Sequence, residues 1–226
     1  ASGLGLINRR GRQQDWFRGR VLFPIADVNG DPIGFGGRIL PGRDGPKYIN
    51  SADCAVYHKS RVLYALDRAK AAIVAHQPAE AIICEGYTDV IAFERIGLGR
   101  AVATCGTALT DEHVNVLKRF AGRFVLAFDA DEAGQSAAER FYTWEQAHGI
   151  DVVVADLPPG VDPGDLAQRD PERLRDAVEG ATPFLEFRLN RLLGSLPLDS
   201  PEHRARAAER AVAVVAEHPS ELVRDQ

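Results

Sequence analysis

The side chains of this sequence best suited to metal binding or catalysis are carboxylates that follow apolar runs. They form three groups, which are Glu85 with Asp89, Asp129 with Asp131, and Asp162 with Asp165. Carboxylate oxygens with no Cys or His among them select hard cations such as Mg²⁺ or Mn²⁺. Two or more such ions, with open positions for phosphate oxygens, form the core of many phosphoryl-transfer sites. Taken singly, each carboxylate also has a purely structural interpretation, for example as a helix cap.

The elements between these carboxylates predict how they are brought together. Short apolar strands are expected at 79–85, 101–105, 123–129 and 151–157, and helices at 88–96, 110–120 and 132–148. Strands that alternate with helices indicate an α/β fold, in which helices cover both faces of a parallel sheet. Ligands bind such sheets at the carboxyl ends of the strands, where all three acidic groups lie.

A β-rich part is expected before this sheet. Residues 21–27 and 33–40 are apolar and flank Asn29-Gly30, a strong signal for a hairpin turn. A turn-rich loop follows at 41–50, and a helix is expected from 60 to 76 because apolar residues recur there on one helical face.

A helical tail is expected after the sheet. Loops around one short helix are expected at 158–181, and two amphipathic helices at 182–193 and 201–216. The sequence therefore predicts three parts, a β-rich basic part at 1–76, a sheet domain at 77–170 and a helical part at 171–226.

Charge divides the chain in a similar way. The 226 residues carry 27 Lys and Arg against 32 Asp and Glu, and this net charge of −5, taken alone, argues against a nucleic-acid partner. Residues 1–70, however, carry 12 basic and 6 acidic residues, a net +6, and the rest carry 15 and 26, a net −11. The first part suits phosphate groups, and cations bound to the second would cancel some of its charge.

Cationic side chains are concentrated on or beside the hairpin. They are Arg18, Arg20, Arg38, Arg43, Lys47 and Lys59. A triphosphate or a template backbone needs such cations, and Arg can hold phosphate through two hydrogen bonds. Arg18 and Arg20 have equal strand parity, so they are expected on one face.

Aromatic residues and glycines accompany these cations. Trp16 and Tyr48 offer rings on which bases can stack, whereas Phe17 and Phe35 are expected to be buried in a small core. The glycines of GFGGR at 34–38 lack the spacing of a dinucleotide-binding loop, and they predict a bulge or a close backbone approach in the hairpin.

Cysteine usage and hydropathy exclude several classes of protein. The three cysteines form no CxxC pair, which argues against a structural zinc site or a disulfide framework in this chain and suits a reducing, cytoplasmic setting. No signal peptide or membrane span is expected. The sequence contains no Met, so we expect a processed chain or an excised part of a longer one.

Three motifs on the predicted sheet resemble the Toprim domain of bacterial primases, type IA and type II topoisomerases and some nucleases. They are EGYTDV (85–90), CGTAL (105–109) and FDADEAG (128–134). Upstream, FRGRVLFPIADVNGDPIGFGGRIL (17–40), PKYINS (46–51) and HKS (58–60) resemble bacterial replicative primases and not the other Toprim families. The resemblance implies a Toprim-type parallel sheet within the RNA polymerase core of a primase, which makes short RNA primers on single-stranded DNA.

The resemblance also implies roles for single residues. Glu85, Asp129 and Asp131 match catalytic residues, and these three together with Asp89 and Asp162 match the acids that hold Mg²⁺ or Mn²⁺, two or more ions in all. The residues implied in nucleotide and DNA binding are Arg38, Lys47 and Lys59, with Tyr48, Asn50, Arg18 and Arg20 in the same strip. This chain departs from the family at Asp162-Pro163-Gly164-Asp165, where the family often has Asp-Pro-Asp, so the role of Asp165 is left open.

The partners follow from the same resemblance. They are a single-stranded DNA template, ribonucleoside triphosphates and the RNA primer, with no membrane. A replicative helicase is expected to bind through a C-terminal domain that this chain lacks, and zinc is expected in an N-terminal domain that it also lacks.

Other functions remain open at this point. A Toprim nuclease or topoisomerase shares the acidic motifs, although a topoisomerase needs a tyrosine nucleophile that is normally supplied by a separate domain. A haloacid-dehalogenase-like phosphatase would account for Asp129-Ala130-Asp131 but not for Glu85-Gly86-Tyr87. A third alternative is a module that binds metal and nucleotide, including nucleotide alarmones, but polymerises poorly by itself.

Overall fold

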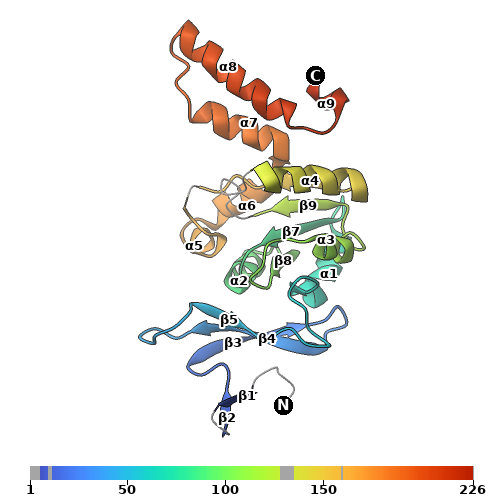
Figure 1. The fold of residues 1–226 in the computed structure, drawn as a ribbon, viewed down its shortest axis with the longest axis vertical. Helices are drawn as coiled ribbons and strands as arrows, with labels where there is room; N and C mark the ends of the chain where they lie inside the picture. The colour runs from blue at the N-terminus through green and yellow to red at the C-terminus, as the bar shows by residue number, and fades with distance from the viewer. Residues whose placement is uncertain (1–5, 10–11, 128–134, 159, 226) are drawn as a thin grey trace.

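Three separate sheets and a helical tail follow one another along the described part of the molecule (Figure 1). The structure, a computed structural model, describes residues 6–9, 12–127, 135–158 and 160–225. A two-stranded hairpin lies at one end with a three-stranded sheet next to it, a six-stranded sheet with its helices lies in the middle, and α7 and α8 lie at the other end.

The six-stranded sheet confirms the predicted α/β fold. Its central strands are β7 (Glu80–Cys84), β8 (Ala101–Thr104), β9 (Arg123–Leu126) and β10 (Asp151–Val154), and they pair in parallel in the order β10-β9-β7-β8. From β7 the chain crosses first to β8 on one side and then to β9 on the other. The strand order therefore reverses between β7 and β9, and in open α/β sheets the ligand crevice forms at such a point, beyond the carboxyl ends.

Helices cover both faces of this sheet. One face packs against α1 (Leu66–Ala75), α3 (Asp111–Leu117) and α4 (Gln135–His148), and the other against α2 (Tyr87–Arg95), α5 (Pro163–Arg169) and α6 (Pro171–Glu179). Adjacent strand residues such as Ile82 and Ile83 enter opposite cores. This two-sided burial explains why the strands are apolar throughout and do not alternate with polar residues.

The three-stranded sheet is antiparallel and consists of β3 (Arg20–Ala26), β4 (Pro32–Ile39) and β5 (Tyr48–Asn50). The hairpin turn predicted at Asn29-Gly30 is confirmed, since Gly30 has a φ of 98°. The Oδ1 atom of Asp27 accepts the N–H groups of Asn29 and Asp31 within this turn. A further hairpin of β1 (Leu6–Arg9) and β2 (Arg12–Asp15) was not predicted.

Two short antiparallel strands correct the expected helix boundaries. The helix expected from 60 to 76 begins only at Leu66, because Leu63 and Tyr64 form β6 and pair with Thr104 and Ala103 of β8. Ala65, with a φ of 68°, separates this strand from α1. At the opposite edge of the sheet, β11 (Thr182–Pro183) pairs with β10 where a helix was expected to begin.

The tail follows the predicted helices closely. It consists of α7 (Phe184–Gly194), α8 (Pro201–Ala216) and α9 (Glu221–Arg224). The ring of Phe184 packs edge-on against Phe141 of α4 at 5.0 Å between centroids, which attaches the tail to the sheet domain. The one short helix expected at 158–181 is instead two helices, α5 and α6, and each follows an Asp cap and begins with a proline. No helix in the described part of the chain has the length and apolar character needed to cross a membrane.

A buried ionic network lies at the amino ends of the parallel strands. Glu80 of β7 is 5% exposed, and its carboxylate accepts hydrogen bonds from Arg100 at 2.9 Å and from Arg123 at 3.0 Å. Arg123 also donates to the carbonyl oxygen of Ala181 at 3.4 Å, beside the edge strand β11. Removing the carboxylate would leave two guanidinium groups beside an apolar core without their counter-charge.

The two sheets meet around one aromatic ring. Tyr87, the first residue of α2, stacks on Phe23 of β3 at 5.0 Å and contacts Tyr64 edge-on at 4.7 Å. A Cβ atom at Gly36 would overlap the Tyr87 ring, and one at Gly37 would overlap Phe17, which is buried as expected. The close backbone approach predicted for GFGGR is therefore confirmed.

We expect Glu80→Ala to lower the free energy of unfolding by about 3 kcal/mol or more, because a buried ion pair broken on one side leaves unpaired charge. Urea unfolding measures this loss. Glu172→Ala is the matched control, since its pair with Arg175 is exposed and is expected to contribute less than about 1 kcal/mol. Equal losses in both variants would contradict the buried network.

Gly36→Ala is expected to destabilise the chain by about 1 to 3 kcal/mol, because the added methyl group displaces the Tyr87 ring. Gly99→Ala serves as control, because a Cβ at that position has no neighbour within 4 Å. Thermal unfolding of both variants measures the difference, and a Gly36 variant as stable as the control would refute the close contact.

Candidate active site at the strand ends

Glu85 and Asp89 lie where β7 gives way to α2. Asp89 is 8% exposed, and its Oδ2 atom accepts the N–H of Gly86, the residue that caps α2, at 3.0 Å. This bond fixes the carboxylate in the first turn of the helix, which agrees with the helix-capping role that a single carboxylate can have. It leaves the other oxygen, Oδ1, directed toward α5, because a Cβ atom at Gly164 would lie 3.5 Å from it.

Asp162 approaches the same point from α5. Its Oδ1 atom accepts the N–H of Asp165 at 2.7 Å and so caps that helix. The same Cβ atom at Gly164 would lie 3.2 Å from Asp162 Oδ1. Burial and the negative charge of Asp162 raise the pKa of Asp89 to about 6. Two carboxylates are therefore held close together, at the cost of mutual repulsion.

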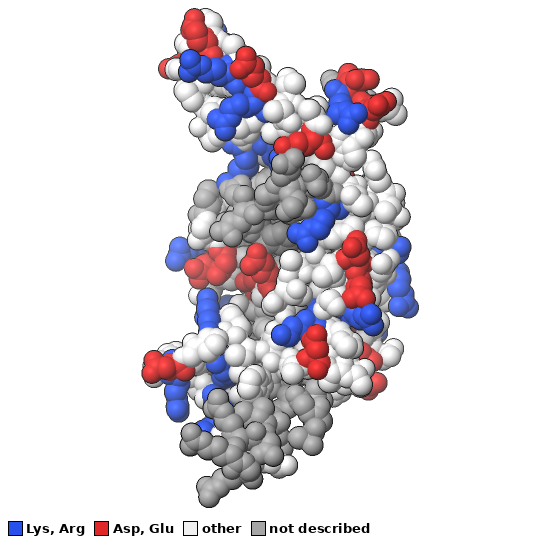
Figure 2. All heavy atoms as spheres, viewed as in Figure 1, with Lys and Arg blue, Asp and Glu red and all other residues white. Residues whose placement is uncertain are grey.

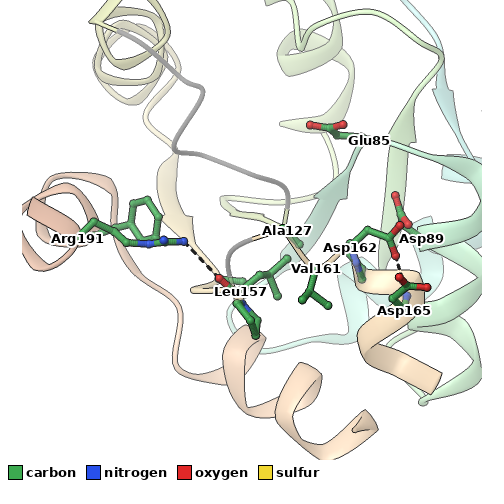
Figure 3. Close-up of a pocket in the computed structure, with 13 residues that line it drawn as sticks. Glu85, Asp89, Ala127, Leu157, Val161, Asp162, Asp165 and Arg191 are labelled. Atoms are coloured by element: carbon green, nitrogen blue, oxygen red, sulfur yellow. Dashed lines mark hydrogen bonds between the residues drawn. The ribbon is translucent and has the colours of Figure 1, made fainter. Parts of the chain in front are cut away.

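These carboxylates share one pocket. Its lining includes Glu85, Asp89, Asp162 and Asp165, together with Phe187 and Arg191 from the tail. Figure 3 shows the three aspartates grouped together, Glu85 further along the pocket and Arg191 on the opposite side. Asp129 and Asp131, which were also predicted here, lie outside the described residues. Asp165 is more than half exposed and faces Arg169 at 4.0 Å.

Arg191 and Phe187 were not predicted to contribute to the site. Arg191 donates from Nη2 to the carbonyl oxygen of Leu157 at 3.3 Å, and its Nε lies 3.3 Å from Asp156 Oδ1 (Figure 3). No local sequence signal pointed to either residue, because both come from a helix more than twenty residues beyond the last acidic motif.

Asn50 and Tyr48 tie β5 to these strand ends. The Asn50 amide donates to the carbonyl oxygen of Cys105 at 2.6 Å, just beyond β8, and its Oδ1 accepts the Tyr87 hydroxyl at 2.7 Å. The Tyr48 hydroxyl lies 3.4 Å from Thr88 Oγ1. Both residues, which were predicted to bind nucleotide or DNA, thus hold the basic sheet beside the carboxylates.

Arg38 and Lys47 flank the ring of Tyr48. The Arg38 guanidinium lies 5.7 Å and the Lys47 ammonium 5.9 Å from the ring centroid, within reach of cation–π attraction. Burial raises the pKa of the Cys105 thiol just beyond β8, and the charge of Lys59 is among the groups that act against this rise. On the face shown in Figure 2, basic side chains of the three-stranded sheet lie directly below acidic side chains of the sheet domain.

Arg18 and Arg20 do not share a strand face. Arg18 lies exposed in the turn before β3, so the parity argument was wrong for this pair. Arg20 donates from Nη1 to the carbonyl oxygens of Gly37 at 3.1 Å and Pro46 at 2.9 Å. Its guanidinium therefore anchors the 41–47 loop to β4.

Among the residues that the structure describes, no three Asp, Glu, His or Cys side chains are grouped closely enough to hold a metal ion. Asp89 and Asp162 provide a partial set of oxygen donors, which is the donor type that Mg²⁺ prefers.

Three family models match successive parts of the chain. Residues 1–70 match the N-terminal domain of the DNA primase catalytic core, residues 82–167 match a Toprim-like domain, and residues 185–226 match the DnaB-helicase binding domain of primase. The last match falls on the tail, although the helicase contact was expected in a domain absent from this chain.

Named relatives extend these matches over the whole chain. The DNA primase of Streptomyces coelicolor is 42% identical over 95% of this chain, and that of Escherichia coli K12 is 36% identical over 99%. The chain spans only 34% and 39% of their respective lengths.

Solved structures indicate the same family. The RNA polymerase domain of the Mycobacterium tuberculosis primase DnaG, in complex with a double-stranded DNA oligomer with a 6-nucleotide overhang, matches with a TM-score of 0.86. It is 37% identical over 100% of this chain, which covers 72% of that domain. A DnaG primase catalytic domain bound to single-stranded DNA matches with a TM-score of 0.73 and 36% identity, over 97% of this chain and 71% of that one. With the strand-end carboxylates and the basic sheet beside them, these matches establish that the chain belongs to the family of bacterial DNA primases, within their RNA polymerase core.

Proposed function

We propose that this chain carries the polymerase centre of a bacterial primase, which joins ribonucleotides into short RNA primers on a single-stranded DNA template. One observation carries the proposal: hydrogen bonds of Asn50 to Cys105 and Tyr87 fix the basic sheet beside the acidic strand ends. A nucleoside triphosphate between them would meet cations on one side and carboxylates on the other. Neither a nuclease nor a topoisomerase is favoured, since the relatives are primases.

Divalent cations, Mg²⁺ or Mn²⁺, would be held by Glu85, Asp89, Asp129, Asp131 and Asp162. Burial and the negative charge of Asp162 raise the pKa of Asp89, and this supports the proposal because a cation among these acids would offset their repulsion. When bound, such ions lower the pKa of the primer hydroxyl and neutralise charge on the transferring phosphate and on the leaving pyrophosphate. Glu85 lies in the same pocket but apart from the three aspartates (Figure 3), and we assign it to metal binding or to assistance of a proton transfer.

The basic side chains would hold the phosphates. Arg38, Lys47 and Lys59 form the cationic side of the proposed site, and the Tyr48 ring, which lies near Arg38 and Lys47, adds an aromatic surface for a base or sugar. Arg18, exposed in its turn, suits a template phosphate. Asn50 and Arg20 use their polar groups internally and contribute by positioning.

The partners of the whole protein follow from its relatives. Relatives have been solved with single-stranded DNA and with double-stranded DNA that carries an overhang, which supports a DNA template here. The match of residues 185–226 to a helicase-binding domain supports a helicase contact through the tail of this chain. Primer synthesis for replication belongs in the bacterial cytoplasm, where free thiols such as those of Cys54, Cys84 and Cys105 persist.

We expect Asp129→Ala and Asp131→Ala each to lower template-directed RNA synthesis about a hundredfold or more, because each removes a carboxylate needed to hold the cation. The measurement is incorporation of ribonucleotides on a single-stranded DNA oligomer with Mg²⁺, by this chain and by a longer primase chain that contains it.

Asp176→Ala is the control, since this exposed acid of α6 lies away from the pocket. Near-normal synthesis by both variants would refute the assignment. Cutting of labelled single-stranded DNA with Mn²⁺, in place of extension, would indicate a nuclease. Synthesis by the longer chain alone would show that this part binds substrates without polymerising.

The raised pKa of Asp89 predicts a pH-dependent stability. A raised carboxyl pKa favours the protonated folded state, so the free energy of unfolding falls as pH rises from about 4 to 6. Without divalent cations at pH 8, Asp89→Asn should be more stable than the parent by about 1 to 3 kcal/mol, because it keeps an acceptor for Gly86 and removes the charge. Near pH 4 the difference should vanish.

Urea unfolding at both pH values in EDTA measures this effect. Asp165→Asn is the matched control, because its carboxylate is exposed and its substitution should leave stability nearly unchanged at either pH. Mg²⁺ should stabilise the parent more than Asp89→Asn. An Asp89 variant that is less stable than the parent at pH 8 would contradict the repulsion.

A further inference from the structure

We propose that His113 is a positioning residue for Lys59, and that it sets the place of this lysine beside the nucleotide phosphates. The inference rests on the proposed function, in which Lys59 contacts phosphate. His113 is completely buried in the first turn of α3, and its ring Nε2 lies 2.8 Å from the carbonyl oxygen of Lys59.

The hydrogen bonds of the ring determine its protonation. The backbone N–H of Thr110 donates to Nδ1 at 3.3 Å, so Nδ1 carries no proton. Nε2 therefore carries the proton and donates it to the Lys59 carbonyl, which can only accept. Burial lowers the pKa of His113 and favours the neutral ring, although its hydrogen bonds to the backbone of Lys59 and Val62 and the nearby carboxylate of Glu112 act in the opposite direction.

Lys59 depends on such contacts because it lies in no helix or strand. Its N–H donates to the carboxylate of Asp53 at 3.2 Å, and its carbonyl accepts from His113. Both backbone polar groups are thus held from outside, which limits the directions in which the partly exposed side chain can extend.

Other hydrogen bonds join the residues after Lys59 to the start of α3, and Lys59 takes no part in them. The Thr110 hydroxyl donates to the carbonyl oxygen of Ser60 at 2.7 Å, and Glu112 accepts from Ser60 at 2.9 Å and from Arg61 at 2.8 Å. Glu112 is partly exposed and offers a matched control, because it joins the same two segments but not through Lys59.

The test is a double-mutant cycle on the full chain, read as the dissociation constant of Mg²⁺–ATP by calorimetry. Lys59→Ala should weaken binding about tenfold, the effect of one lost charge-assisted hydrogen bond. His113→Ala should weaken it about fivefold to tenfold in the parent, but not in the Lys59→Ala background, because the histidine acts through the lysine.

His113→Gln should restore most of the affinity, since its amide can donate to the Lys59 carbonyl and accept from Thr110. Glu112→Gln should change affinity less than twofold, and Mn²⁺ affinity should stay unchanged in all the variants. If His113→Ala unfolds the chain, the comparison uses His113→Gln with and without Lys59→Ala. Native affinity for Mg²⁺–ATP then supports the positioning role only if the glutamine amide still donates to the Lys59 carbonyl.

Two results would overturn the inference. If His113→Ala weakens binding equally with and without Lys59, or weakens Mn²⁺ binding as well, the histidine has a general structural role and the proposed function stands. If Lys59→Ala leaves Mg²⁺–ATP binding unchanged, the phosphate role of Lys59 fails, and the positioning role fails with it.

Discussion

The contact between the Tyr87 ring and the backbone of β4 determines how the two sheets of this molecule are arranged. Gly36 lets the ring approach the strand, Phe23 and Tyr64 surround it, and its hydroxyl donates to Asn50. Tyr87 belongs to the motif that also supplies Glu85 and Asp89. One short segment therefore provides two of the carboxylates of the candidate site and also the aromatic surface on which the basic sheet rests.

This arrangement explains how a chain of net negative charge can still present a basic surface. The basic charge lies on one sheet and the acidic charge at the ends of the other, and their junction brings both signs to a single edge. Burial of Asp89 beside Asp162 shows that the acidic side is held against its own repulsion. Close acids that are fixed by helix caps are prepared for a cation before it binds, because the backbone and not the ion positions them.

Elements with strong local signals could be predicted from the sequence, whereas those formed by distant pairing could not. The α8 helix begins at Pro201 after the Ser200 cap, as its local pattern indicates. By contrast, Leu63 and Tyr64 form a strand only because β8 lies beside them. In the site, the sequence motifs were enough to bring four of the predicted acids to one pocket, Glu85, Asp89, Asp162 and Asp165. The internal bonds of Asn50 and Arg20, and the arrival of Arg191 from the tail, depend on contacts between distant segments that no local pattern encodes.

The two shortest strands have a consequence for behaviour at high concentration. The parallel strands β8 and β10 would each present an open row of backbone donors and acceptors, on which another chain could add a strand. Antiparallel β6 and β11 cover these rows, and each has only two residues, too few to template further pairing. The sheet is thereby protected from edge-to-edge aggregation on both sides, even though its core strands are almost wholly apolar.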